Sequence, residues 1–268
     1  MKNNYKFGII GCGNMAEAIL SGAIKKKIID SFDNLVYDIN LDKAMAFAEK
    51  YDVCLANSNA DVAERAEYVL LSVKPQSFDE VAVDLKDAKF IISIMAGVKI
   101  DTIKNKIPQL NAVARIMPNA PVKVGLGMSA ISYRGANEEN QTFVNTLFDA
   151  IGKTVNVEED KLDAVTAISG SGPAYVYYFI KSMIDAGVKI GLSEKESRVL
   201  TYQTFLGATE LSSQSELNLD TLIDMVCSKG GTTIEAIKTF RENNTDKIIE
   251  KAINACYNRS LELSGVKK

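Results

Sequence analysis

The sequence predicts an α/β protein with an N-terminal Rossmann-type dinucleotide-binding domain followed by an all-helical domain. Short apolar segments alternate with helix-like segments along the first half of the chain, which is typical of βαβ units and a parallel sheet. A glycine-rich turn follows the first apolar segment. Beyond about residue 160, apolar residues recur at helical spacing and strand signals nearly disappear. We therefore expect domains at residues 1–160 and 161–268, with no proline- or glycine-rich linker between them.

The elements of the first domain follow from the alternation of apolar and helix-like segments. Strands are expected at residues 6–10, 35–37, 53–55, 68–73, 90–94 and 113–117. Helix-like segments, such as 15–27 and 42–50, lie between the first five. Residues 125–132 and 154–157 are candidate edge strands, with a helix expected at 138–150 between them.

The second domain should consist of helices. Ser193 and Glu196 have the spacing of a capping box, which predicts that a helix begins there. Further helices are expected at residues 236–240 and 248–263.

Composition excludes several classes of protein. The chain has 268 residues, 47% of them hydrophobic, and a net charge of −3 with both signs interspersed. This argues against a dedicated nucleic-acid-binding protein, which usually carries a basic stripe. No apolar run approaches the ~20 residues that cross a bilayer, so we expect no membrane partner. The N-terminus lacks the pattern of a secretory signal, and we expect a cytoplasmic protein.

Histidine and cysteine usage limits the chemistry. The chain has no histidine, which excludes histidine general bases and histidine metal ligands. The four cysteines lack CxxC spacing, so we expect neither a disulfide framework nor a metal site.

The glycine-rich turn matches the dinucleotide-binding fingerprint. Gly11, Cys12, Gly13, Asn14 and Met15, followed by Ala16, fit the pattern G-x-G-x-x-G/A. Gly11 would permit the tight turn, and Gly13 would let the backbone approach a pyrophosphate. The position after a strand and before a helix supports this interpretation, although a glycine-rich turn without a ligand is the alternative.

Asp38 directly follows the second predicted strand. A carboxylate there would accept hydrogen bonds from the adenosine ribose and repel a 2′-phosphate. Residues 39–41 contain no arginine to hold that phosphate. On this basis Asp38 favours NADH over NADPH, unless it is a solvated aspartate of a turn.

Three later strand ends carry unusual residues. Lys74 and Pro75 follow the fourth strand, the small residues Ala96 and Gly97 follow the fifth, and prolines flank Asn119 after the sixth. Ligands of open parallel sheets bind beyond the carboxyl ends of strands, so these residues could face a nicotinamide. Lys74 is either a cofactor contact or a solvated lysine.

A second glycine cluster lies in the helical domain. In the segment 227–235, Thr232 and Glu235 have capping-box spacing, which predicts a helix start. Two glycines, two threonine hydroxyls and a helix N-terminus together favour a site for a small anion such as a substrate carboxylate. A plain helix cap is the alternative.

Taken together, the motifs GIIGCGNMA, SVKPQ, SIMAGV, RIMPNAP, VEEDKLDAVTAISGSGPAYVY and SKGGTTIEA resemble the pyrroline-5-carboxylate reductases. They span residues 8–237, nearly the whole chain. The resemblance implies reduction of (S)-1-pyrroline-5-carboxylate to L-proline by NADPH or NADH. It also implies an interlocked homodimer formed by the helical domain, often assembled into a decamer.

The resemblance also implies roles for particular residues. Residues 11–15 would line the pyrophosphate, Asn59 would bind the cofactor, and Val73–Pro75 and Met95–Gly97 would line its nicotinamide half. The substrate carboxylate would be held by Ser228, Gly231, Thr232 and Thr233, with Thr233 also bonding the ring nitrogen. Glu159 and Glu216 match residues near bound substrate. Many members prefer NADPH, whereas Asp38 followed by Ile39 weakens that expectation here.

Two other functions compete with this interpretation. The β-hydroxyacid dehydrogenases share the two-domain plan, but their helical domain carries a G-x-x-G-x-G-x-x-x-K pattern whose lysine acts as acid and base. In this chain the position of that lysine, four residues after Gly172, is occupied by Val176. A non-catalytic sensor of NAD(P)H is the second, and it would leave the 227–235 anion loop without a purpose. Turnover of the imine separates both from the reductase.

Overall fold

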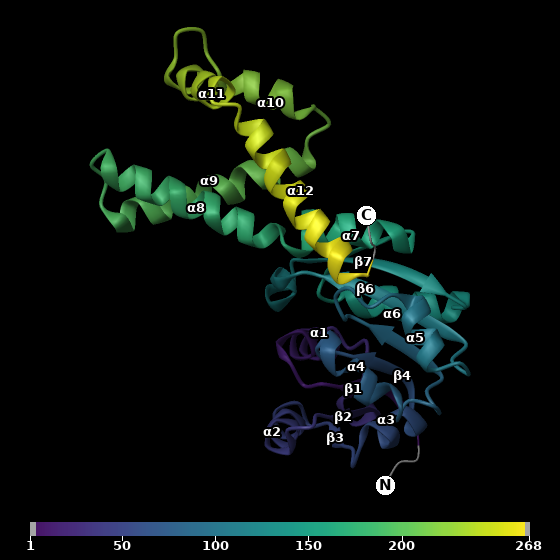
Figure 1. Ribbon diagram of the computed structural model, residues 1–268. Helices are drawn as coiled ribbons and strands as arrows, with labels where there is room; N and C mark the ends of the chain where they lie inside the picture. The colour runs from purple at the N-terminus through teal and green to yellow at the C-terminus, as the bar shows by residue number, and fades with distance from the viewer. Residues whose placement is uncertain (1–3, 266–268) are drawn as a thin grey trace. The chain divides into compact units, whose positions relative to one another are not determined.

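The computed structural model describes residues 4–265 (Figure 1). Its contacts divide the chain into two compact units. The first unit contains the chain up to Ser171 and the residues from Cys256 onward, and the second contains Gly172–Ala255. The functional domain boundary expected near residue 160 stays a prediction.

The first unit is built on one eight-stranded sheet with the order β3-β2-β1-β4-β5-β6-β7-β8. The strands are β1 Tyr5–Ile10, β2 Asn34–Tyr37, β3 Cys54–Leu55, β4 Ala66–Leu71, β5 Phe90–Ser93, β6 Ala112–Pro118, β7 Gly127–Arg134 and β8 Gly152–Asn156. All neighbouring pairs are parallel except β6 with β7. The predicted edge position is right for β8 and wrong for β7, which pairs on both sides.

Helices cover both faces of this sheet, as the near-continuous apolar strands require. The helices of the first unit are α1 Asn14–Lys25, α2 Leu41–Tyr51, α3 Asn59–Arg65, α4 Phe78–Ala82, α5 Ile100–Lys106, α6 Glu138–Asp149 and α7 Leu162–Val165. One core cluster joins the sheet to α1, α2 and α6, and the other joins it to α3, α4 and α5. Alternate residues of β4 belong to different clusters: Tyr68 and Leu70 lie in the first cluster, and Val69 and Leu71 lie in the second.

The second unit is helical, as predicted. Its helices are α8 Gly172–Lys189, α9 Glu194–Gln214, α10 Leu219–Val226, α11 Thr232–Glu242 and the first part of α12 Thr245–Leu263. The capping box that starts α9 is confirmed, because Ser193 Oγ accepts from the Glu196 amide at 3.2 Å and Glu196 accepts from the Ser193 amide at 2.8 Å. Within residues 4–265, none of the helices is both long and apolar enough to span a bilayer.

Candidate active site

A cavity of about 600 Å³ opens at the carboxyl ends of β1, β2 and β4. The strand order reverses between β1 and β4, which is the switch point where open α/β sheets bind ligands. The lining residues come from the ends of β1 and β2, from the segments after β1, β2 and β4, from the first turns of α2 and α3, and from α4 and the segment after it. They are Ile10, Gly11, Gly13, Tyr37, Asp38, Ile39, Lys43, Asn59, Ser72, Val73, Lys74, Ser77, Glu80, Val81 and Asp84.

The glycine-rich turn forms one wall of this cavity. Gly11 has φ +95°, and a Cβ there would lie 2.7 Å from the carbonyl oxygen of Ser72. Gly13 is the N-cap of α1, has no side-chain cap, and would place a Cβ in open space. The first amides of α1 are therefore available to a diphosphate. Cys12, Asn14 and Met15 complete the turn and the start of α1.

Asp38 is buried beside the turn and fixes it. Its Oδ2 accepts from the Cys12 amide at 2.8 Å, and its Oδ1 accepts from the Asn40 amide at 3.0 Å. Burial raises the pKa of this carboxyl, but hydrogen bonds from the amides of Asn40 and Cys12 and from the Lys43 ammonium outweigh burial, so the pKa is lowered. Asp38 is thus held as an anion at the cavity wall.

Other predicted cofactor residues come from the segment after β4 and from the start of α3. Val73 and Lys74 follow β4 and line the cavity, and Pro75 comes next in a 3-10 turn. Asn59 is the first residue of α3, and its Nδ2 donates to Asp84 Oδ2 at 3.0 Å. The structure therefore gathers Asn59, Val73 and Lys74 with Gly11, Gly13 and Asp38 around one cavity, whose lining does not include Pro75.

The predicted nicotinamide residues after β5 and β6 do not line this cavity. Met95 is buried, and Gly97 has φ +76° with a Cβ position 3.0 Å from the carbonyl oxygen of Leu263 at the end of α12. Asn119 donates to the backbone and hydroxyl of Ser169 and accepts from the Met128 amide at 2.9 Å. Contact of these residues with a cofactor stays a prediction.

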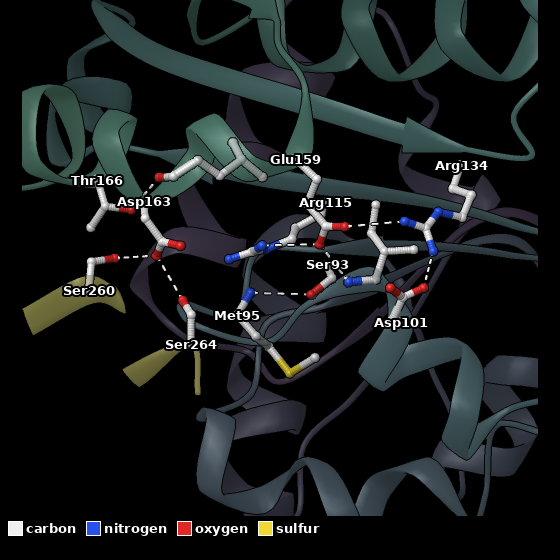
Figure 2. A network of polar contacts seen from close by, with 12 residues as sticks. Ser93, Met95, Asp101, Arg115, Arg134, Glu159, Asp163, Thr166, Ser260 and Ser264 are labelled. Atoms are coloured by element: carbon white, nitrogen blue, oxygen red, sulfur yellow. Dashed lines mark hydrogen bonds and ion pairs between the residues drawn. The ribbon is translucent and has the colours of Figure 1, made fainter. Parts of the chain in front are cut away.

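Glu159 lies in a network of charged groups (Figure 2). Its Oε1 accepts from Arg115 at 3.1 Å and from the Ile100 amide at 2.7 Å, and its Oε2 lies 3.6 Å from Arg134. Arg134 also pairs with Asp101. The carboxylate ties β6 and β7 to the start of α5, and so fixes the end of the segment that carries Met95 and Gly97. Its expected contact with substrate stays a prediction.

The predicted substrate loop lies in the second unit, before α11. Gly230 has φ +73°, and the amide of Gly231 donates to the carbonyl of Ser228 at 2.9 Å. The helix begins at Thr232 as expected, but the predicted capping box is wrong: Gly231 is the N-cap with no side-chain cap, and Glu235 pairs with Lys238. Thr232 is exposed and Thr233 half-buried. Glu216 is exposed in the connection before α10.

These observations fit a nicotinamide dinucleotide in the first unit. Such a cofactor requires three features that are present here: a positive-φ glycine without room for a Cβ, an N-cap glycine beside open space, and an anion at the end of β2. Gly11 to Met15 would hold the diphosphate, and Asp38 would face the adenosine ribose.

Sequence reasoning missed two groups near these residues. Lys43 lies five residues after Asp38, and its Nζ is 3.2 Å from Asp38 Oδ2. Arg115 is 5% exposed within β6 and pairs with Glu159. A buried arginine inside an apolar strand was the available signal for the second, since such a charge needs a partner.

Two family models match the chain. Residues 159–263 match the model described as pyrroline-5-carboxylate reductase dimerisation. Residues 6–97 match the model described as NADP oxidoreductase, coenzyme F420-dependent.

Curated relatives match along nearly the whole length. A pyrroline-5-carboxylate reductase of Haemophilus influenzae is 39% identical over 262 residues, covering 95% of this chain and 96% of the relative. One of Staphylococcus aureus is 36% identical over 267 residues, covering 97% and 98%.

Solved structures agree with these relatives. A pyrroline-5-carboxylate reductase of Coxiella burnetii superposes with a TM-score of 0.90 at 32% identity, covering 98% of this chain and 99% of that one. A pyrroline carboxylate reductase of Plasmodium falciparum with NADP bound has a TM-score of 0.87 at 30% identity, covering 98% and 100%. Both the sequence and the fold therefore lead to one conclusion: the chain belongs to the pyrroline-5-carboxylate reductase family.

Proposed function

We propose that this protein reduces (S)-1-pyrroline-5-carboxylate to L-proline with NADPH or NADH, the last step of proline biosynthesis. The observation that carries the proposal is the cavity at the switch point, which gathers the glycine-rich turn and Asp38 beside Asn59 and Val73. The bound cofactor would supply a hydride to the imine carbon. A proton on the ring nitrogen completes the product amine.

The chain's own residues would bind and align the reactants. The imine nitrogen can be protonated in solution, so the reaction needs no histidine to donate that proton, and the chain has no histidine. Alignment of the two reacting carbons is then the main contribution of the enzyme. The uncapped N-terminus of α11, with Thr232, Thr233, Gly231 and Ser228, would hold the substrate carboxylate.

We further propose that the second unit forms a homodimer, and that dimers assemble into a decamer. Many of its large apolar side chains are exposed in the single chain, among them Tyr178 at 70%, Met225 at 69% and Leu206 at 61%. A surface of this kind usually marks an interface. All four cysteines are free thiols, which suits a cytoplasmic enzyme.

The first experiment follows the absorbance of NADH and NADPH in parallel after pyrroline-5-carboxylate is added to the purified protein. We expect rapid, imine-dependent oxidation of at least one cofactor. Binding of the cofactor without oxidation would reject the reductase and favour a different substrate or a sensor.

Thr233 can be tested with a matched control on the same helix. Thr233→Ala should raise KM for the imine or lower kcat by about tenfold, because a hydrogen bond to a charged group is lost. Thr239→Ala removes a hydroxyl that donates to the Glu235 carbonyl at 2.9 Å, and its kinetics should match the parent protein. Equal kinetics for both variants would remove Thr233 from the site.

A further inference from the structure

Lys43 places a cation at the cavity wall that Asp38 makes acidic. It lies in the first turn of α2 and lines the cavity. Its Nζ is 3.2 Å from Asp38 Oδ2, and its side chain remains 48% exposed while that of Asp38 is 11% exposed. The ammonium is therefore paired with the buried carboxylate and still open to the cavity.

The hydrogen bonds of Asp38 leave it little capacity to act alone on a ligand. Oδ2 already accepts from the Cys12 amide and from Lys43, and Oδ1 accepts from the Asn40 amide. Two of these three donors are backbone amides that hold the glycine-rich turn and the start of α2. Lys43 in turn offsets the negative charge that would repel a phosphate at this place.

We propose that Lys43 determines how the site receives the adenosine 2′ position: its ammonium neutralises Asp38 and binds a 2′-phosphate, which admits NADPH. Asp38 then acts mainly as a positioning residue for the turn. An ammonium has three donors, and the Asp38 bond uses one of them. This inference rests on the proposed NAD(P)H-dependent function and assigns a specificity-determining residue within it.

The other charges of the cavity support this placement. Glu80, in α4, and Asp84, just after it, also line the cavity, and both would repel a phosphate. Lys74 also lines the cavity but follows β4, on the far side of β1 from the end of β2. Among the cavity-lining residues that the structure describes, Lys43 is thus the cation next to the expected ribose site.

The test measures binding of NADPH and of NADH separately, by titration of cofactor fluorescence without imine. Lys43→Met should weaken NADPH binding by about tenfold or more and NADH binding by less than about twofold, because one charge-assisted contact to the 2′-phosphate is lost. Lys43→Arg should keep the parent ratio of the two dissociation constants. Lys50→Met is the control, since Lys50 lies on the same helix but pairs with Glu17.

Salt adds an independent readout. Raising ionic strength should reduce the NADPH preference of the parent protein more than that of Lys43→Met. An unchanged NADPH-to-NADH ratio in Lys43→Met would overturn the proposal, as would an equal loss of both cofactors. If the NADPH-to-NADH ratio is unchanged in Lys43→Met while that variant still reduces the imine, the role of Lys43 is rejected and the proposed function stands. If the parent protein binds neither cofactor, the proposed function fails with it.

Discussion

At the residue scale, the position of Cys12 in the glycine-rich turn determines the reactivity of its thiol. Cys12 is 4% exposed, and its amide is bonded to Asp38. Burial, helped by the nearby negative charge of Asp38, raises the pKa of this thiol to about 12. Since the thiolate is the reactive form, Cys12 should stay protonated and inert throughout the physiological range.

Alkylation kinetics test this expectation. At pH 8, iodoacetamide should modify Cys12 much more slowly than Cys227, which is half-buried in the loop before α11. The rate at Cys12 should keep increasing with pH beyond the range in which an ordinary thiol levels off, because its raised pKa keeps the neutral form dominant there. Mass spectrometry of the peptides gives both rates. Equal rates at pH 8 would contradict the burial described here.

At the element scale, the turn between β1 and α1 has two glycines that are required for different reasons. Gly11 has a backbone conformation and a neighbour, the Ser72 carbonyl, that exclude a side chain. Gly13 has neither constraint, and it lines the cavity. The first glycine should therefore serve stability, and the second should serve binding.

The pair of variants Gly11→Ala and Gly13→Ala separates these roles. Gly11→Ala should lower the free energy of unfolding by more than about 1 kcal/mol, because positive φ is costly for a residue with a Cβ. Gly13→Ala should leave the free energy of unfolding unchanged and weaken NADPH binding by about tenfold, because its methyl group enters the space for the diphosphate. Urea denaturation and cofactor titration measure the two effects. A stability loss in Gly13→Ala equal to that in Gly11→Ala would be inconsistent with this division.

The end of α12 is held in place by hydrogen bonds to a buried carboxylate (Figure 2). The buried Asp163, in α7, accepts from Ser260 at 2.6 Å and from Ser264 at 2.7 Å, both through Oδ1. These bonds satisfy a carboxylate that would otherwise be costly to bury. They fix the last turns of α12 within the first unit.

Removing both hydroxyls should expose the cost of this carboxylate. Ser260→Ala should lower the free energy of unfolding by about 1 kcal/mol, and the double variant Ser260→Ala/Ser264→Ala by about 2–4 kcal/mol, because Asp163 is then left without these donors. Ser213→Ala, on an exposed face of α9, is the control and should have almost no effect. A double variant as stable as the control would refute the role of Asp163.

Particular residues explain how much could be predicted from sequence. The sheet was predictable because each buried strand is a short apolar run between helical segments. The glycine-rich turn was predictable because glycines with the G-x-G-x-x-G/A spacing come directly after a predicted strand. The direction of β7 was not, since periodicity does not distinguish parallel from antiparallel pairing. The contact of Lys43 with Asp38 depends on a side chain reaching back from α2, and the pairing of Glu159 with Arg115 joins residues 44 positions apart.

At the scale of the whole molecule, the helical unit should not exist as a single copy. Few of its residues are buried: Ile180, Ile184 and Gly187 in α8, and Ser197 and Thr201 in α9. So small a core in 84 residues, Gly172–Ala255, cannot offset the entropy of ordering the chain. Stability must come from association.

Sedimentation velocity tests this requirement. The protein should sediment at twice the 29.2 kDa chain mass or a multiple of it, and its unfolding temperature should rise with protein concentration. Tyr178→Glu should dissociate the assembly, because it places a charge in an apolar interface. Val83→Glu, at an equally exposed apolar site of the first unit, should not. A monomer in the parent protein would reject the proposed assembly.

The connection between the two units has a consequence for how the chain could be edited. The chain leaves the first unit after Ser171 and re-enters it at Cys256, and the Sγ of Cys256 lies 3.3 Å from the Oγ of Ser171. The helical unit is thus an insertion in the first unit, and the residues that flank its two ends lie in contact. A few glycines could join Ser171 to Cys256 directly, and the nucleotide-binding unit would then become a shorter chain that keeps its C-terminal segment, from Cys256 onward, in place.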